Sequence, residues 1–195
     1  MKIFVFILCF CFDWSTFWTA LTAIATFWLV IVARGQLKKI NSQNSISILF
    51  NLEGEWNSKF FRKKRKFLAQ GLQSALDKPE TLRTHTTLKS QIADIFIFFE
   101  KVAVLANKDE IDVDLVYNTY SYHIKYFWEI AVNIGYITQI REEPTGYDFF
   151  IEFENLYKSL SKKNGWKEFS KVQLLKFCEE EANIDEEGNM SSRLL

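Results

Sequence analysis

The chain has 195 residues, in which 24 lysines and arginines balance 24 aspartates and glutamates, and it holds 19 phenylalanines but only seven glycines and two prolines. This composition excludes a collagen-like or turn-rich small-stranded protein, and 48% hydrophobic residues exclude disorder of the whole chain. A net charge of zero argues against affinity of the whole chain for nucleic acid. Cys9, Cys11 and Cys178 form neither a disulfide framework nor CxxC metal spacing, which fits a reducing compartment for the polar part.

The charges are distributed unevenly along the chain. Residues 1–33 hold only Lys2 and Asp13, and residues 34–195 hold all the others. Residues 14–33 are uncharged, and as a helix rising about 1.5 Å per residue they cover about 30 Å, the hydrocarbon thickness of a bilayer. The sequence therefore predicts a membrane anchor over residues 1–33, with a spanning helix at about 14–33.

Basic residues follow this predicted span directly. Arg34, Lys38 and Lys39 lie on its C-terminal side, whereas its N-terminal side offers one lysine and one aspartate. The positive-inside rule then places the N-terminus outside and the C-terminal domain in the cytoplasm. We expect a single-pass membrane protein in this orientation.

A cleaved signal peptide is the alternative for the N-terminus. Lys2 precedes a ten-residue apolar run, and residues 23–25 (Ala-Ile-Ala) form a candidate cleavage box. Against cleavage, Asp13 interrupts the apolar core, and cleavage would leave the apolar stretch TFWLVIVA on the product. We expect residues 1–12 to extend the span or to lie in the outer interface, because ten residues cannot cross a bilayer separately.

One face of the predicted span carries small hydroxyl residues. Ser15, Thr19, Thr22 and Thr26 are spaced by four, three and four residues, so they fall within a wedge about 60° wide. Small and hydroxyl residues are favoured where helices meet in lipid, and we expect self-association through this face, which we call the seam. Two alternatives stay open: the seam lines a narrow pore, or each hydroxyl bonds a carbonyl of its own helix.

The polar remainder of the chain shows helical periodicity. Apolar residues recur at steps of three and four over residues 45–77, 84–107, 112–139 and 147–160, and a weaker helix follows to Phe177. The stretch 84–107 is apolar nearly all round, which predicts a central, buried helix. We expect an all-α protein, with one N-terminal transmembrane helix followed by a cytoplasmic bundle of four or five helices.

Composition divides the chain into four parts. The anchor at 1–33 is followed by a polar juxtamembrane joint at 34–44, a helical domain at 45–177 and an acidic tail at 178–195. Residues 179–187 hold six acids and no base, and no apolar period continues beyond them. We therefore expect the tail to be disordered.

A dense basic cluster lies near the start of the helical domain, beside Phe60 and Phe61. Its members are Lys59, Arg62, Lys63, Lys64, Arg65 and Lys66. Basic residues close to an anionic leaflet gain about 1 kcal/mol each, so contact with anionic membrane lipids is our first expectation. The same cations suit the phosphates of a nucleic acid or oligonucleotide, and a merely solvated face is the third reading.

Motifs that carry catalysis or cofactor binding are absent from the sequence. GxxxxGK[ST], GxGxxG, GxSxG and HExxH do not occur, so we expect no enzyme activity, no cofactor and no metal site. Glu100 is the one acid embedded in the apolar run IFIFFEKVAV, and it must be paired or exposed. An unfamiliar catalytic site would need Glu100, His123 and Arg141 to converge. The candidate partners of the Glu100 carboxylate are Lys101, His123, Lys125 and Arg141.

Several phrases of the sequence carry a family resemblance. ARGQLKK follows the predicted span, and EWNSKFFRKKRK, IADIFIFFEKVAVLANKDEID, VYNTYSYHIKYFWE and REEPTGYDFFIEFENLY come after it. Over about residues 14–160 the chain resembles a bacterial family of single-pass, membrane-anchored helical domains of unknown function. The resemblance implies this topology in a bacterial inner membrane and no catalytic residues, and by analogy a signalling, scaffold or phage-defence accessory role.

These observations predict a membrane-anchored protein that acts by oligomerisation and binding. We expect its partners to be membrane lipids, a second copy of the chain and a partner protein, with nucleic acid or an oligonucleotide less favoured. The alternative is a gated pore or membrane-perturbing effector, whose cytoplasmic domain senses a nucleotide or nucleic-acid signal through residues 59–66.

Overall fold

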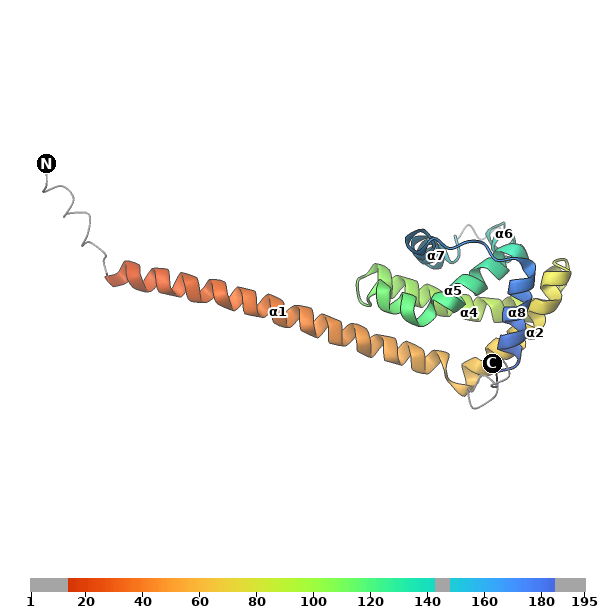
Figure 1. The fold of residues 1–195 in the computed structure, drawn as a ribbon, viewed down its shortest axis with the longest axis horizontal. Coiled ribbons are helices and arrows are strands. Elements are labelled where there is room, and N and C mark those ends of the chain that lie inside the picture. The colour runs from red at the N-terminus through yellow and green to blue at the C-terminus, as the bar shows by residue number, and fades with distance from the viewer. Residues whose placement is uncertain (1–13, 143–147, 185–195) are drawn as a thin grey trace, which may run out of the picture. The chain divides into compact units, whose positions relative to one another are not determined.

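The computed structural model of the chain describes residues 14–142 and 148–184, and Figure 1 shows their course. Helices make up most of these residues and no strand occurs among them, which confirms the predicted all-α class. The helices are α1 (Trp14–Trp56), α2 (Lys59–Asp77), α3 (Thr81–Thr84), α4 (Thr86–Asn107), α5 (Val113–Asn133), α6 (Tyr136–Arg141), α7 (Ile151–Asn164) and α8 (Lys171–Ala182).

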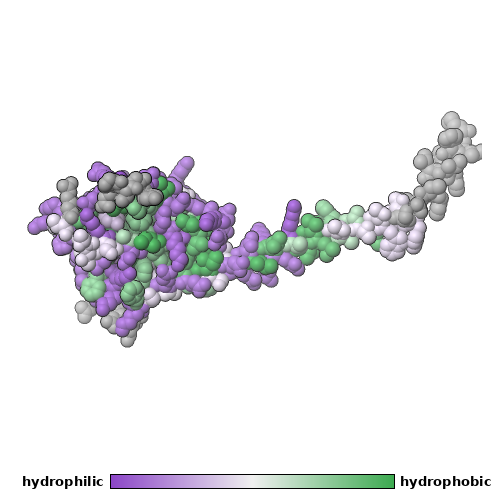
Figure 2. Space-filling view, turned by 180° about the vertical axis from the view of Figure 1, so that it is seen from behind, coloured by the Kyte–Doolittle hydropathy of each residue, from purple (hydrophilic) through white to green (hydrophobic). Residues whose placement is uncertain are grey.

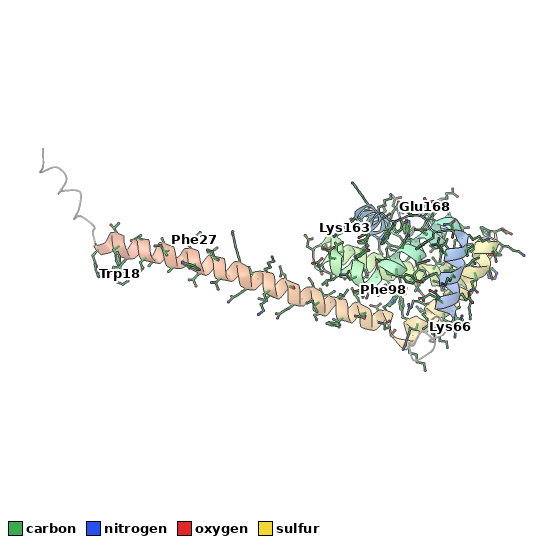
Figure 3. All side chains as sticks on the ribbon, in the orientation of Figure 1. Trp18, Phe27, Lys66, Phe98, Lys163 and Glu168 are labelled. Atoms are coloured by element: carbon green, nitrogen blue, oxygen red, sulfur yellow. The ribbon has the colours of Figure 1, made fainter. Side chains whose placement is uncertain are left out.

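Helix α1 begins with an apolar stretch whose large side chains are exposed. Trp18 and Phe27 stand out from this helix in Figure 3, and Phe27 is 67% exposed. Within the part of the chain that the structure describes, one helix, α1, is long and apolar enough to span a membrane. The helix runs through residues 34–44 without a break, and the chain divides into two compact units after Gln43.

The second unit, from Asn44 onward, buries its apolar side chains around α4. Phe96 and Phe99 of α4 are almost inaccessible to solvent. The Phe99 ring stacks on Phe153 of α7 with centroids 5.0 Å apart, and it lies 5.1 Å from the Trp56 ring at the end of α1. The prediction of a central, buried helix over this stretch is confirmed, because helices α2, α5 and α7 pack against α4 and cover most of its surface.

The first predicted helix of the domain is interrupted. The periodicity favoured one helix over 45–77, but the chain turns at Asn57 and Ser58, and α2 starts afresh at Lys59. The Ser58 side chain accepts a hydrogen bond from the Phe61 N–H at 3.2 Å and so caps the new helix. The break lets α1 and α2 present separate apolar faces to the same core.

Turn and capping residues determine where the later helices begin and end. The predicted helix over 112–139 ends at Asn133, because Gly135 adopts a left-handed conformation with φ of 72° before α6 begins. Asp112 caps α5 by accepting the Asp114 N–H, and Gly165, with φ of 60°, ends α7.

The predicted disordered tail over 178–195 is wrong for its first residues. Helix α8 continues to Ala182 and buries Cys178 and Glu181. Ser170 and Gln173 form a capping box that starts this helix, and Leu174 and Phe177 on the same face bury it against the domain. The remainder of the predicted tail, residues 185–195, lies outside the described residues.

Candidate functional site

The threonines of the seam lie on the exposed surface of α1. The Thr22 hydroxyl donates to the Thr19 carbonyl at 2.9 Å, and the Thr26 hydroxyl donates to the Thr22 carbonyl at 2.8 Å. Both hydroxyl protons therefore bond carbonyls of their own helix, which was one of the two alternatives to self-association. Each position presents a methyl group and an acceptor oxygen outward. The Ser15 side chain lies outside the described residues. The self-association and pore-lining roles stay predictions.

The six cations of the basic cluster point in different directions. Arg65 turns toward the core, because it continues the buried helical spacing of Phe61, Leu68 and Leu72. The other five cations are exposed or half-buried on α2: Lys59, Arg62, Lys63, Lys64 and Lys66.

Arg65 is 3% exposed and belongs to a buried ionic cluster with His123 of α5 and Glu181 of α8. Its Nη1 lies 3.2 Å from Glu181 Oε2, and His123 Nε2 lies 3.2 Å from Glu181 Oε1. The guanidinium carbon sits 4.3 Å from the centre of the Trp56 ring, a cation–π contact. Arg65 was expected to contact an outside anion or lipid. The structure corrects this, because the guanidinium is paired inside the domain.

Burial dominates the electrostatics of this cluster. It lowers the pKa of Arg65, which the Glu181 carboxylate opposes, and it raises the pKa of the Cys178 thiol to about 12, with Glu181 adding to the effect. A buried pair of this kind adds little net stability, yet removing one partner leaves the other charge uncompensated. The cluster therefore fixes how α2, α5 and α8 pack together.

The outward face of α2 carries a second group of side chains, which we call the outer stripe: Phe60, Lys63, Lys64 and Phe67. Phe60 is 69% and Phe67 is 49% exposed. The Lys64 ammonium lies 4.7 Å from the Phe60 ring centre and 2.7 Å from Asp94 Oδ2 of α4, and the Lys63 ammonium lies 5.8 Å from the Phe67 ring centre. The outer stripe therefore presents two apolar rings, each beside an ammonium group.

Glu100 has a different partner from those the sequence suggested. Its carboxylate accepts the backbone N–H of Phe153 at 2.8 Å and that of Glu152 at 3.3 Å, at the first turn of α7. Phe150, which precedes that turn, adopts a left-handed conformation and supplies no side-chain cap. Glu100 thus caps α7 from a neighbouring helix, where a negative charge is favoured by the helix dipole.

The three residues of the catalytic hypothesis enter different interactions. Arg141 donates to Glu154 Oε2 at 2.6 Å, and so it joins Glu100 at the first turns of α7. His123 instead belongs to the buried cluster with Arg65. The arrangement offers Glu100 and Arg141 as structural groups around α7, and each is occupied by an acceptor or donor of that helix.

A cavity of about 620 Å³ opens beside α3 and the turn between α5 and α6. Its lining is mostly uncharged, and in the described ranges no group of three His, Cys, Asp or Glu side chains is placed to hold a metal ion. Sequence reasoning gave no sign of this cavity, because its lining comes from helix ends and turns. The lining residues are Pro79, Glu80, Leu82, Asn133, Ile134, Gly135, Thr138, Gln139 and Glu142.

Comparison with known proteins identifies a family but no activity. The sequence model of a family described as a domain of unknown function (DUF4760) matches residues 16–160, which include most of α1 and continue into α7. No curated protein matches the chain. No solved structure matches it either.

Proposed function

The chain belongs to this family of unknown function, and we propose that it is a membrane-anchored protein that acts by self-association and binding rather than by catalysis. In this proposal, residues 14–33 of α1 span the membrane, the seam brings copies together, and the helical domain from Asn44 onward binds partners. The positive residues after the span, Arg34, Lys38 and Lys39, support a cytoplasmic position for that domain.

The exposure of the apolar part of α1 carries this proposal. The phenylalanines of α4 are buried in the domain core, whereas α1 leaves Leu21, Phe27, Trp28 and Leu29 exposed among the described residues. Apolar surface in water costs about 25 cal/mol per Å², so a helix of this kind requires an apolar solvent. A bilayer supplies that solvent over the length of the span.

Membrane fractionation tests the anchor. We expect the full chain to stay with membranes after an alkaline carbonate wash, and the intact mass to include residues 1–25. A cleaved product that begins after residue 25, or a chain that appears in the soluble fraction without detergent, would contradict the proposal. This measurement also separates an anchor from a signal sequence.

Substitution of the seam tests self-association. In Thr19→Leu/Thr22→Leu/Thr26→Leu, the larger leucine side chains block the close approach of two helices. At roughly 0.6 kcal/mol per position, the association constant measured by cross-linking in detergent falls about twentyfold. The matched control is Ile24→Leu/Ile31→Leu on the opposite face, which should change nothing. Equal cross-linking in the two variants would exclude the seam as the interface.

A further inference from the structure

The outer stripe of α2 has an excess of positive charge that the domain does not balance. Lys64 pairs with Asp94, with both side chains about one third exposed, and a pair of this exposure contributes little. Arg62, Lys63 and Lys66 have no acidic partner within the described part of the chain. Four exposed or half-buried cations thus lie on one helix, and one carboxylate, Asp94 of α4, pairs with them.

Two exposed phenylalanines accompany this charge. Phe60 and Phe67 are seven residues apart, or two turns, so both rings project from the same side of α2. Phe61, Leu68 and Leu72 lie about 100° further around the helix, and that side packs on the domain. The domain therefore does not use the two outer rings for its own stability, and a helix face with lysines around projecting aromatic rings is typical of one that lies in a membrane interface.

We propose that the outer stripe docks on the headgroups of anionic lipids. The Phe60 and Phe67 rings enter the boundary between headgroups and acyl chains, and the ammonium groups of Lys63 and Lys64 pair with lipid phosphates. Arg62 and Lys66 add long-range attraction from the flank. This proposal rests on the proposed anchor, because an anchored chain holds the stripe at a high effective concentration beside the bilayer.

The positive charge of the outer stripe favours an anionic lipid surface as its partner. The basic residues that follow the span indicate that the domain lies on the cytoplasmic side, where the membrane surface is the anionic one. A single-stranded nucleic acid would use the same lysines and rings, but it would need bases to stack on the two phenylalanines. We therefore infer anionic lipid as the partner, and binding of a single-stranded nucleic acid becomes an outcome of the test.

The test uses the full chain in vesicles, with a polarity-sensitive dye on Gln70→Cys. Gln70 is exposed and lies one turn after Phe67. Cys9→Ser and Cys11→Ser leave Cys178, which is buried, as the one other thiol of the chain. Vesicles contain either phosphatidylcholine alone or roughly 30% phosphatidylglycerol, with spin-labelled lipid as quencher. We expect quenching in the anionic vesicles and little in the neutral ones, and 1 M salt, with a Debye length of about 3 Å, should remove it.

Two variants test whether the quenching depends on the outer stripe. Lys63→Gln should lower the bound-to-free ratio about fivefold, and Phe67→Ala about tenfold. The matched control is Val172→Ala, which removes an apolar side chain that is 75% exposed on α8 and should change nothing. Far-ultraviolet circular dichroism should show the same melting temperature for all three, because none of these side chains is buried.

Each outcome has one meaning. Quenching that needs both Lys63 and Phe67 supports the proposal. A chain that resists the alkaline wash but shows no quenching in either vesicle overturns the lipid contact and leaves the anchor intact. A chain that the wash removes contradicts the proposed function itself. A dye response to an added single-stranded oligonucleotide, without any response to anionic lipid, overturns the lipid contact in favour of nucleic acid.

Discussion

The start of α1 and the middle of α4 are both rich in large apolar residues, but those of α1 are exposed and those of α4 are mostly buried. Phe27 of α1 is 67% exposed, whereas Phe99 of α4 is completely buried and has aromatic neighbours on α1, α5 and α7. Apolar content therefore identifies a helix that needs an apolar environment, but it does not say whether protein or lipid supplies that environment. For α4 the answer is protein, because α2, α5 and α7 pack against it and its large side chains are buried, whereas the large apolar side chains of residues 14–33 are exposed.

The largest expected effect separates the two phenylalanines. Phe99→Ala opens a cavity at the centre of the domain and should lower the free energy of unfolding by about 3–5 kcal/mol. Phe27→Ala is the matched control and should leave the unfolding of the domain unchanged. Thermal unfolding in detergent, followed by circular dichroism, gives both values. Equal melting temperatures for the two variants would mean that Phe99 is not part of a packed core.

The same contrast exists between two cations of one helix. Arg65→Ala removes the guanidinium from the buried Glu181 carboxylate and leaves it only the half-buried His123, so the free energy of unfolding should fall by up to about 3–5 kcal/mol. Lys63→Gln removes an exposed charge, and we expect a change below about 0.5 kcal/mol. Urea unfolding of both variants measures the difference, and Arg65→Ala/Glu181→Leu should recover most of the loss. An unchanged free energy of unfolding in Arg65→Ala would argue against the buried cluster.

The sequence contained part of the signal for this cluster. Position 65 follows Phe61 by four residues and precedes Leu68 by three, so helical spacing alone turns it toward the core. The sequence did not indicate its partner, Glu181, because this residue lies in an acidic stretch whose composition predicted a disordered tail. Ser170 and Gln173, the two ends of a capping box, mark the start of the helix that carries Glu181 inward. The pairing itself joins positions 116 residues apart, and local patterns do not encode such distances.

The partner of Glu100 could not be predicted from side-chain chemistry. The sequence suggested a cation or a histidine, but the carboxylate binds backbone N–H groups at the start of α7. These N–H groups need an acceptor from another helix because Phe150 occupies the cap position and has no polar side chain. Helix periodicity predicted α7 itself, whereas the tertiary position of its first turn depended on how α4 and α7 pack.

Removal of this cap gives a smaller effect than removal of a core residue. Glu100→Ala leaves two N–H groups of α7 without an acceptor, so we expect a loss of about 1–2 kcal/mol in the free energy of unfolding. Hydrogen exchange should speed up at the amides of Glu152 and Phe153. Glu55→Ala, which removes an exposed carboxylate paired with Lys101, is the control and should leave exchange in α7 unchanged. Unchanged protection in Glu100→Ala would assign the cap to another group.

The effect that is smallest at neutral pH concerns the Cys178 thiol, because burial and the Glu181 charge raise its pKa to about 12 and its contribution changes only in alkali. An unfolded chain loses this proton near pH 9, so between pH 9 and 12 the unfolded state binds fewer protons than the folded state. The thiol's contribution to the free energy of unfolding is constant below pH 9 and declines as the pH rises through that window. The variant Cys178→Ser should lose this part of the alkaline slope in urea titrations. In a chain with Cys9→Ser and Cys11→Ser, the buried thiol should resist maleimide at pH 8 until the domain unfolds, in contrast to a cysteine placed at exposed Gln70. Rapid labelling of the native chain would contradict the burial of α8.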